Sequence, residues 1–254
     1  MFRLGYFNDL TMTKLATIRA ALESIAMQSR LQENRAVTLV GGGAVNESDL
    51  SMALGMAPRL VAADGGANHC ARLGHLPEQV IGDLDSLDPE LREALGERVL
   101  YVPDQNSTDL DKCLARIAAP FVLALGFDGA RLDHTLAAMT SLVGHGRARV
   151  VMIAAQDIVF LAPPRLDLPL PVGARVSLYP LGLVRGRSDG LQWPIEGIDF
   201  YPEAQVGTSN RANADRVVIE VDRPAMLVLL ERSSLEQVLD GLLSGPEWSE
   251  PPQR

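Results

Sequence analysis

The chain has 254 residues, which is long enough to bury a hydrophobic core in one large domain or two modest ones. Hydrophobic residues make up 47% and charged residues 22%, the balance of a globular rather than a disordered protein. The net charge of -9 argues against a nucleic-acid-binding protein, because phosphate backbones attract lysine and arginine. An acidic protein that binds an anionic nucleotide needs a local cation, which a divalent ion held by carboxylates supplies.

The sequence also lacks the marks of several other classes. The two cysteines, Cys70 and Cys113, have neither zinc-site spacing nor the pattern of a disulfide framework. No apolar run is long enough to span a membrane, and the N-terminus has no signal-peptide core. We therefore expect a cytoplasmic protein that binds neither membranes nor nucleic acids.

Residues 1–34 differ from the rest of the chain. They contain apolar residues at helical spacing, namely Leu15, Ile18, Leu22 and Ile25. This spacing predicts one amphipathic helix. We interpret the segment as a packing appendage, or as residues that precede a true start at Met12 or Met27.

Short apolar segments alternate with helical segments over residues 35–162. The predicted strands are 37–40, 59–63, 79–81, 98–102, 121–125 and 149–153. The predicted helices are 67–73, 89–95, 110–118 and 135–143. Continuous apolar strands that alternate with helices predict an α/β fold, with a mostly parallel sheet covered by helices on both faces.

Proline and glycine become frequent after Leu161, which predicts a linker over residues 163–171. Short β-like segments follow at 174–178, 216–221 and 226–230, and a helix is predicted over 234–243. This pattern predicts a small antiparallel β domain over residues 172–246. Residues 247–254 are predicted to form a polar tail.

Polar residues follow most of the predicted strands of the first domain. In open α/β sheets the ligand crevice lies at the carboxyl ends of the strands. We therefore expect Asp64, Asp83, Asp85 and the loops near Asp104 and Gly126 to converge, although they are far apart in the sequence.

The segment 82–86 contains two aspartates two residues apart. In an extended segment Asp83 and Asp85 project to the same side, where they can share one magnesium ion or bracket a metal-bound phosphate. A turn explains the segment equally well, because Asp, Gly and Ser are common turn formers. Asp88 precedes Pro89 and is better explained as a helix N-cap.

The segment 64–68 follows a strand and opens a helix. Its glycines, Gly65 and Gly66, permit a tight turn that exposes backbone amides suited to a phosphate. A plain strand-to-helix turn is the alternative. The glycines at 41–43 have the same two interpretations, and neither segment matches a named nucleotide fingerprint.

Two further segments open helices. In 104–109, Ser107 or Thr108 can cap the helix and Asp109 suits its positive end, but capping does not account for so many polar groups. In 131–134, Arg131 presents a planar fork suited to phosphate, and Asp133 is a candidate N-cap, metal ligand or hydroxyl acceptor.

Other polar and aromatic residues carry less information. His134 is a lone histidine that we interpret as structural, and Trp193 as core or edge packing. The segment 207–210 is predicted to be a polar tight turn. No Ser/His/Asp or Cys/His arrangement stands out, so covalent catalysis is not supported.

Taken together, five segments resemble the motifs of the thiamine pyrophosphokinase family. In chain order they are 64–68, 82–86, 104–109, 131–134 and 207–210. The resemblance spans roughly residues 37 to 230, in order and with compatible spacing. Each motif is weak alone, whereas five in register are highly specific.

The resemblance implies an α/β nucleotide-binding domain followed by a β-sandwich domain that binds thiamine. It implies transfer of pyrophosphate from ATP to the hydroxyl of thiamine, which gives thiamine diphosphate and AMP. It also implies Mg²⁺ as the cofactor and a homodimer with active sites between the subunits.

The resemblance further assigns expected roles by motif position. It implies Asp83, Asp85 and Asp109 as Mg²⁺ ligands, with Asp64 and Asp133 as further acidic residues of the same site. The implied substrate-binding residues are Gly65, Gly66, Asn68, Gln105, Thr108, Arg131, Ser209 and Asn210. Of these, Ser209 and Asn210 resemble the turn that holds the aminopyrimidine of thiamine across the dimer. Leu227 stands where some relatives carry a tryptophan that stacks on thiamine, so an aromatic face would be lost.

This chemistry agrees with the residues themselves, because phosphoryl-type transfer depends on positioning and charge neutralisation more than on a protein nucleophile. A carboxylate of Asp133 or Asp85 would accept the hydroxyl proton or only orient the hydroxyl. Two other functions stay open. One is a Mg²⁺-dependent nucleotidyltransferase, which would release pyrophosphate instead of AMP. The other is a non-catalytic nucleotide- or thiamine-binding module.

Overall fold

The structure is a computed structural model that describes residues 31–32, 35–129 and 131–249. The helix predicted around Leu15 to Ile25, and the tail beyond Ser249, lie outside the described residues. No helix within the described ranges has both the length and the apolar character that a membrane crossing requires.

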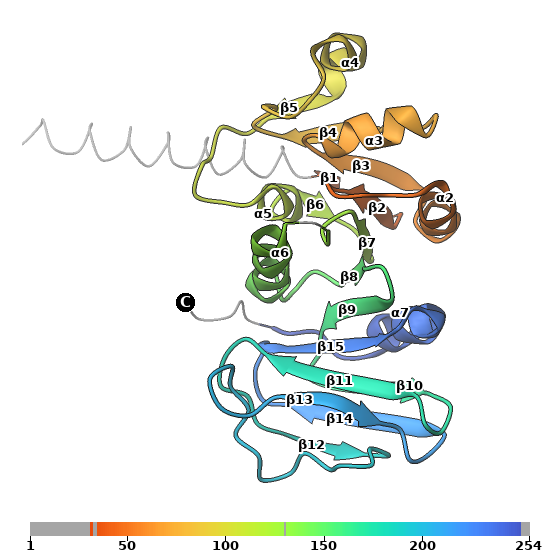
Figure 1. The fold of residues 1–254 in the computed structure, drawn as a ribbon, viewed down its shortest axis with the longest axis vertical. Coiled ribbons are helices and arrows are strands. Elements are labelled where there is room, and N and C mark those ends of the chain that lie inside the picture. Colours follow the sequence, from red (N-terminus) through yellow and green to blue (C-terminus); the bar gives the residue numbers. More distant parts are fainter. Residues whose placement is uncertain (1–30, 33–34, 130, 250–254) are drawn as a thin grey trace, which may run out of the picture.

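One mixed sheet of ten strands extends through the described part of the chain (Figure 1). Its strands are β2 (Val37–Val40), β3 (Arg59–Ala63), β4 (Gln79–Gly82), β5 (Val99–Tyr101), β7 (Val122–Leu125), β8 (Val150–Ile153), β9 (Asp157–Leu161), β11 (Arg175–Pro180), β13 (Gly207–Arg211) and β15 (Met226–Glu231). Their order across the sheet is β13-β11-β15-β9-β8-β7-β2-β3-β4-β5. The strands from β5 to β8 are parallel, and each pair from β8 to β13 is antiparallel.

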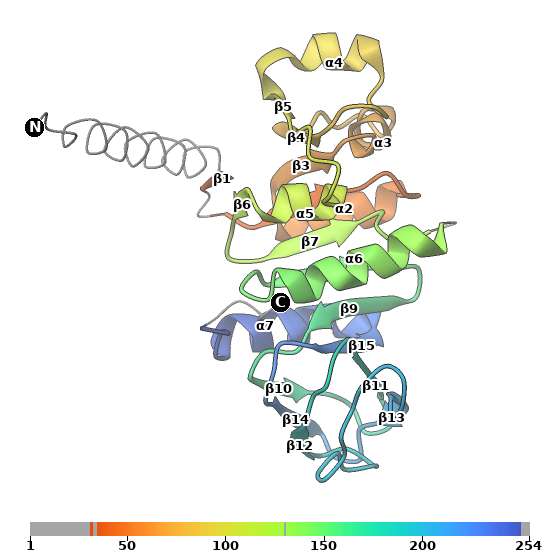
Figure 2. The ribbon, with the colours of Figure 1, turned by 90° about the vertical axis from the view of Figure 1, so that its left-hand side faces the viewer.

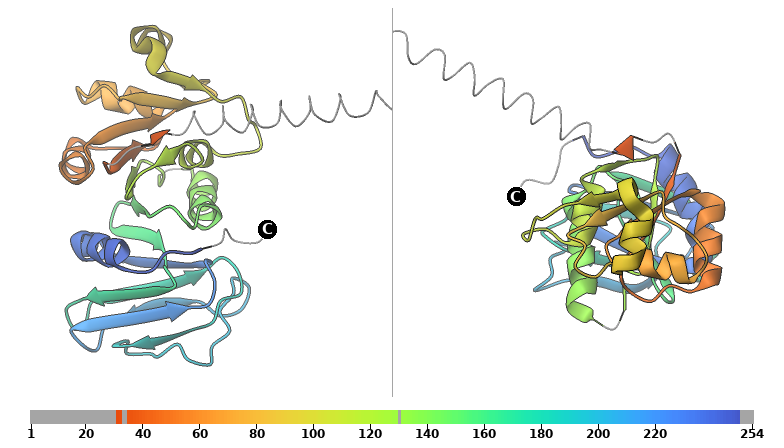
Figure 3. Two further views of the ribbon diagram at one scale, coloured as in Figure 1. Left: turned by 180° about the vertical axis from the view of Figure 1, so that it is seen from behind. Right: turned by 90° about the horizontal axis from the view of Figure 1, so that it is seen from above.

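Helices cover both faces of the parallel part, as the sequence predicts. They are α2 (Glu47–Met56), α3 (Gly66–Arg72), α4 (Pro89–Leu95), α5 (Asp109–Leu114), α6 (Leu132–Gly144) and α7 (Leu235–Ser244). Figure 2 shows α5 and α6 in front of the sheet, and Figure 3 shows α2 and α7 together on its other side. Side chains alternate between two cores: Val40 joins Leu50 of α2, whereas Leu39 joins Leu142 of α6.

The helix α2 is missing from the sequence-based prediction. Its apolar residues do not gather on one face, since the glycine Gly55 and several polar residues interrupt the pattern. The signal that marks it is its N-cap, because the Asn46 side chain accepts a hydrogen bond from the backbone N–H of Asp49 at 2.8 Å.

The predicted linker over residues 163–171 is wrong, because it contains the strand β10 (Arg165–Pro169). Leu166 and Leu168 are buried while Arg165 and Pro169 are exposed, which is the alternation of a half-buried strand. The prolines in this segment end the strand rather than prevent it.

The strand β10 belongs to a second, antiparallel sheet of three strands, in the order β10-β14-β12. The other two strands are β12 (Gly186–Asp189) and β14 (Arg216–Val221). Ile219 of this sheet and Val228 of the large sheet share one core cluster, as in a sandwich of two sheets. The large sheet continues through residue 161 without a break, so the division at residues 162 and 172 into two domains stays a prediction.

Smaller elements complete the described chain. β1 (Leu31–Gln32) pairs with β6 (Ile117–Ala118), so the helix predicted over 110–118 ends earlier than expected. Single 3₁₀ turns lie at η1 (Gly96–Arg98) and η2 (Arg232–Ser234). In the predicted polar tail, Trp248 is half-buried and its Nε1 donates to the carbonyl of Ala162 at 2.9 Å.

Candidate active site

A cleft of about 1250 Å³ lies at the carboxyl ends of the parallel strands. The predicted site residues that line it are Asp64, Gly65, Asn68, Asp83, Asp85, Gln105, Thr108, Asp109, Arg131 and Asp133. Three others do not line it, namely Gly66, Ser209 and Asn210. The parallel sheet therefore brings four of the five motifs to one place.

Asp64 follows the last residue of β3 and lies at the bottom of this cleft. It is 2% exposed, and its Oδ1 is buried with no hydrogen-bond partner among the described residues. Burial raises the pKa of Asp64 to about 7, together with the charge of Asp109 and the neighbouring carboxyls of Asp85 and Asp83. A side chain at Gly82 would approach the Cβ of Asp64 to 2.9 Å, so a glycine lets the two strand ends meet.

Three carboxylates converge in the cleft. Asp64, Asp83 and Asp109 each offer an oxygen, and these oxygens lie within 4.8 Å of one another. We call these residues the acidic triad. An all-oxygen donor set suits Mg²⁺, and the unpartnered Oδ1 of Asp64 supplies a buried acceptor for a cation. The residues present therefore fit a divalent metal ion.

Lys112 of α5 is the site residue that sequence reasoning missed. It is 4% exposed, and its Nζ lies 3.2 Å from Asp83 Oδ2 and 3.1 Å from Asp109 Oδ1. Burial opposes its charge, but the hydrogen bonds to Asp109 and Asp83 outweigh burial and raise the pKa of the ammonium. A signal existed in the sequence, because Lys112 follows Asp109 by three residues, a spacing that places the two side chains on one face of α5.

Asp83 accepts a second hydrogen bond in the same place. The side-chain Nε2 of Gln105 donates to Asp83 Oδ2 at 3.0 Å. Burial works against the charged form, but the hydrogen bonds from Lys112 and Gln105 prevail and lower the pKa of Asp83. The carboxylate of Asp83 is therefore ionised and pre-positioned.

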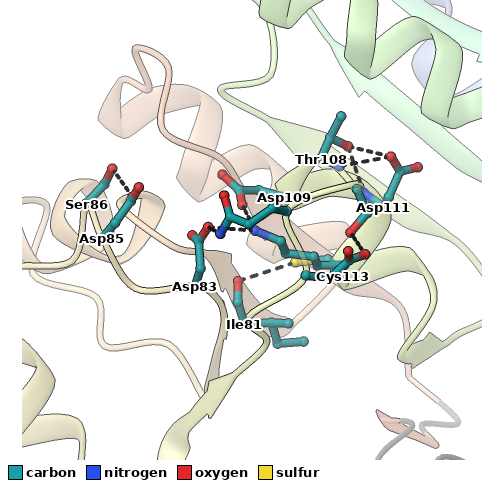
Figure 4. Close-up of polar contacts among 12 residues, drawn as sticks. Ile81, Asp83, Asp85, Ser86, Thr108, Asp109, Asp111 and Cys113 are labelled. Atoms are coloured by element: carbon teal, nitrogen blue, oxygen red, sulfur yellow. Dashed lines mark hydrogen bonds and ion pairs between the residues drawn. The ribbon is translucent and has the colours of Figure 1, made fainter.

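Asp85 is not a member of the acidic triad, although its carboxyl neighbours that of Asp64. The prediction of an extended segment that projects Asp83 and Asp85 to the same side is wrong. β4 ends at Gly82, and Leu84 has a φ of 65°, so the backbone is not extended between the two aspartates. Asp85 is exposed, and its Oδ1 accepts from the hydroxyl of Ser86 at 2.8 Å, as Figure 4 shows. It also lines the cleft.

A capping box fixes the start of α5 and confirms Thr108 as the N-cap. The Thr108 Oγ1 accepts from the backbone N–H of Asp111 at 3.0 Å, and Asp111 Oδ2 accepts from the backbone N–H of Thr108 at 3.1 Å. Asp111 Oδ1 also contacts His145 Nε2 at 3.1 Å, which ties α5 to the end of α6. These bonds hold the helix that carries Asp109 and Lys112 (Figure 4).

The residues at the start of α6 are exposed. Arg131 is the N-cap residue, and its guanidinium donates to Asp133 Oδ2 at 2.7 Å. Asp133 is therefore not the N-cap, and burial does not hold it in place. His134 is also exposed, so the structural role expected for it is not supported by packing.

The segment 207–210 is part of the edge strand β13 rather than a tight turn. Ser209 has a φ of 62°, at an irregularity in the pairing of β13 with β11. Asn210 is buried, and its side chain donates to the carbonyl of Trp193 at 2.7 Å. Trp193 is 52% exposed, with the Arg211 guanidinium 5.8 Å from its ring centre. Of the predicted core or edge packing, the core alternative is therefore wrong.

Two other predicted positions serve packing. Leu227 is fully buried in β15, between Leu161 of β9 and Tyr179 of β11, so it forms no wall of an open cleft in this chain. A side chain at Gly66 would lie 2.1 Å from the carbonyl oxygen of Val40, so this glycine permits close contact between α3 and β2.

Comparisons with known proteins agree with this architecture. The family described as "Thiamin pyrophosphokinase, catalytic domain" matches residues 51–153. Thiamine pyrophosphokinase 3 of Oryza sativa subsp. japonica is 27% identical over 214 residues, which cover 68% of this chain and 80% of that protein.

Solved structures show the same fold. The thiamin pyrophosphokinase from Candida albicans matches with a TM-score of 0.66 and 17% identity, over 78% of this chain and 89% of that one. The yeast thiamin pyrophosphokinase matches with a TM-score of 0.63 and 20% identity, over 83% of this chain and 90% of that one.

The fold, the acidic cleft and the matching catalytic domain define an α/β enzyme of the transferase class, a kinase. The family model, the curated relatives and the structural neighbours all point to one family within this class. Over residues 51–153 the chain matches the catalytic domain of the thiamine pyrophosphokinase family, and its fold resembles that of thiamine pyrophosphokinases.

Proposed function

We propose that this enzyme transfers pyrophosphate from ATP to the hydroxyl of thiamine, which gives thiamine diphosphate and AMP. The observation that carries the proposal is the acidic triad at the bottom of the cleft, in a chain that matches this catalytic domain. The triad supplies carboxylates that would hold a cation, and that cation would neutralise charge on the triphosphate.

The acidic triad would hold Mg²⁺, which neutralises charge on the phosphate oxygens of the donor. Gln105 and Lys112 keep the Asp83 carboxylate in place for this role. Asp85, on the rim of the same cleft, would add charge to the outer side of the site. The family resemblance implies Asp83, Asp85 and Asp109 as Mg²⁺ ligands. We add the buried Asp64 to this set.

The residues at the start of α6 are suited to contact a phosphate of the donor and the hydroxyl of thiamine. The Arg131 guanidinium is exposed, and Asp133 is the one side chain of the described residues to which it is bonded, so it can turn toward a phosphate. Asp133 would then accept the proton of the thiamine hydroxyl or orient that hydroxyl. A cleft of about 1250 Å³ has room for a nucleotide.

The two cysteines of the described chain are not suited to act as nucleophiles, which supports direct transfer of pyrophosphate from ATP to thiamine. Cys70 and Cys113 are both buried, and burial raises the pKa of Cys70 to about 12. Neither is a thiolate nucleophile. We therefore infer in-line attack of the thiamine hydroxyl on the β-phosphorus of ATP, without a covalent enzyme intermediate.

We also infer a homodimer with the active site between subunits. Ser209, Asn210 and the exposed Trp193 do not line the cleft of their own chain. Asn210 holds the Trp193 loop at the sandwich end of the molecule, beside the edge strand β13. A second subunit would bring such a surface to the cleft and place thiamine against it.

The test is a product assay with purified protein, ATP, Mg²⁺ and thiamine. The proposal predicts AMP and thiamine diphosphate in equal amounts, and no product after chelation of the metal. Release of free pyrophosphate would instead indicate a nucleotidyltransferase. No consumption of ATP at all would favour a binding module.

A further inference from the structure

A buried lysine lies between two members of the acidic triad. The ammonium of Lys112 is within 3.2 Å of Asp83 and 3.1 Å of Asp109, and the side chain is almost completely buried. It reaches the cleft from α5, whose start is fixed by the Thr108 capping box. The helix thus delivers one carboxylate and one cation to the same point.

The position of this lysine reduces the repulsion among the carboxylates of the acidic triad. Three carboxylates with oxygens within 4.8 Å of one another repel, and burial strengthens the repulsion. Lys112 neutralises two of them, whereas Asp64 keeps a buried oxygen that has no hydrogen-bond partner within residues 31–32, 35–129 and 131–249. Lys112 therefore provides a partner for Asp83 and for Asp109, and the Oδ1 of Asp64 is left as an acceptor for a cation.

A divalent cation on the acidic triad would need oxygens of the two carboxylates that the lysine already contacts. Mg²⁺ binds oxygen at about 2.0 to 2.1 Å, so an ion on the triad would lie only a few ångströms from the ammonium. Two cations at that separation repel strongly in a partly buried site. The lysine stem has rotatable bonds, so the ammonium can leave the carboxylates for another anion in the cleft.

We propose that Lys112 is a built-in counter-ion that holds the acidic triad together before metal binds, competes with the metal for Asp83 and Asp109, and then turns to the phosphates of the donor. This inference deepens the proposed function and rests on it, because the donor phosphates are the anion to which the lysine turns. It makes binding of metal and of nucleotide mutually dependent.

The first test is Mn²⁺ binding to the purified full chain without nucleotide, measured by titration calorimetry. Lys112→Met removes the charge and keeps much of the stem. We expect it to bind Mn²⁺ on the order of tenfold more tightly than the wild type, because a competing cation is gone. Lys112→Arg, which keeps the charge, should bind like the wild type.

A matched control removes a different cation from the same cleft. Arg72 lines the cleft but is bonded to His69 and not to the triad. Arg72→Met should leave the Mn²⁺ affinity close to that of the wild type. A gain as large as that of Lys112→Met would overturn the inference, because general charge would then explain the effect.

The second test adds α,β-methylene ATP, in which the bond that would break is replaced. In the wild type the analogue should tighten Mn²⁺ binding, and in Lys112→Met this gain should be smaller. Chelation of the metal by the analogue in solution is the same for both proteins, so it cancels in the comparison. An equal gain in the wild type and in Lys112→Met would overturn the proposal that the Lys112 ammonium moves to the donor phosphates.

The outcomes separate this inference from the proposed function. If wild-type protein binds no Mn²⁺ and forms no thiamine diphosphate, the proposed function fails. If it binds Mn²⁺ and Lys112→Met binds equally or more weakly, only the counter-ion inference fails. Should Lys112→Met not fold, Lys112→Gln keeps a hydrogen-bond donor without charge and must show the same tightening.

Discussion

At the residue scale, the site depends on carboxylates that the fold keeps at different depths. Asp64 is buried, Asp83 is held by Gln105 and Lys112, and Asp85 is exposed beside Ser86. The sequence shows Asp83 and Asp85 as an equivalent pair. The break in backbone direction at Leu84, with its φ of 65°, makes them unequal.

This inequality predicts different effects of two matched substitutions. Asp83→Asn removes a charge from the acidic triad and should lower thiamine diphosphate formation by roughly 100-fold or more. Asp85→Asn removes a charge from the rim and should have a smaller effect. Steady-state rates at several Mg²⁺ concentrations compare them, and a larger loss in Asp85→Asn would contradict this placement of the metal.

The site residues that could be predicted from the sequence are polar residues in the loops that follow predicted strands. Asp64 and Asp109 follow that rule, because parallel strands bring their carboxyl ends together. Lys112 could not be predicted in the same way, since a lysine on a short helix normally indicates a solvated face. Only the packing of α5 against β4 reveals that it is buried.

At the element scale, the short helix α5 is the platform of the site. It is only six residues long, so its own hydrogen bonds stabilise it little, and its capping box is correspondingly important. Thr108 and Asp111 satisfy each other's backbone amides at its start. The contact between Asp111 and His145 fixes it against α6.

Removal of the cap should weaken both the fold and the site. We expect Thr108→Ala to lower the free energy of unfolding by about 1 kcal/mol, measured by urea denaturation. It should also lower the transfer rate, because α5 carries Asp109 and Lys112. Thr108→Ser keeps the hydroxyl and should be close to the wild type, and equal damage from both variants would contradict a capping role.

The elements differ in how far the sequence predicts them. The strands β7 and β8 are continuous apolar runs, β2 is apolar except for Thr38, and all three are fully buried, so the sequence predicts them well. The helix α2 lacks a clear apolar face, and the strand β10 lies among prolines that suggest a linker. In both, tertiary packing rather than local pattern decides the structure.

At the scale of the whole molecule, contacts far apart in the sequence join the two ends of the described chain. The carboxylate of Asp49 in α2 accepts two hydrogen bonds from the Arg232 guanidinium in η2. Both side chains are largely shielded from solvent. The bridge links α2, which covers the parallel part of the sheet, to the C-terminal helix that follows η2.

This bridge predicts a pH dependence of stability. Hydrogen bonds from Arg232 hold the pKa of Asp49 below its usual value of about 3.9. Its stabilisation is therefore present above that pH and is lost as the pH falls through the lowered pKa of the folded state. Asp49→Asn should destabilise the protein by about 1 kcal/mol at neutral pH, and the difference should shrink in acid.

Thermal unfolding from pH 7 down to pH 3 measures the difference. The exposed pair of Asp199 and Arg185 provides the control, because Asp199→Asn removes a charge that solvent already screens. A constant gap between Asp49→Asn and the wild type over this range would contradict the assignment of the bridge.

The proposed reaction depends on which phosphorus of ATP is attacked. ATP labelled at the β-phosphorus, incubated with Mg²⁺, thiamine and the purified enzyme, distinguishes the possibilities. Attack at the β-phosphorus predicts that all transferred label appears in thiamine diphosphate while AMP is unlabelled. Label in ADP or in free pyrophosphate, with none in thiamine diphosphate, would contradict the account.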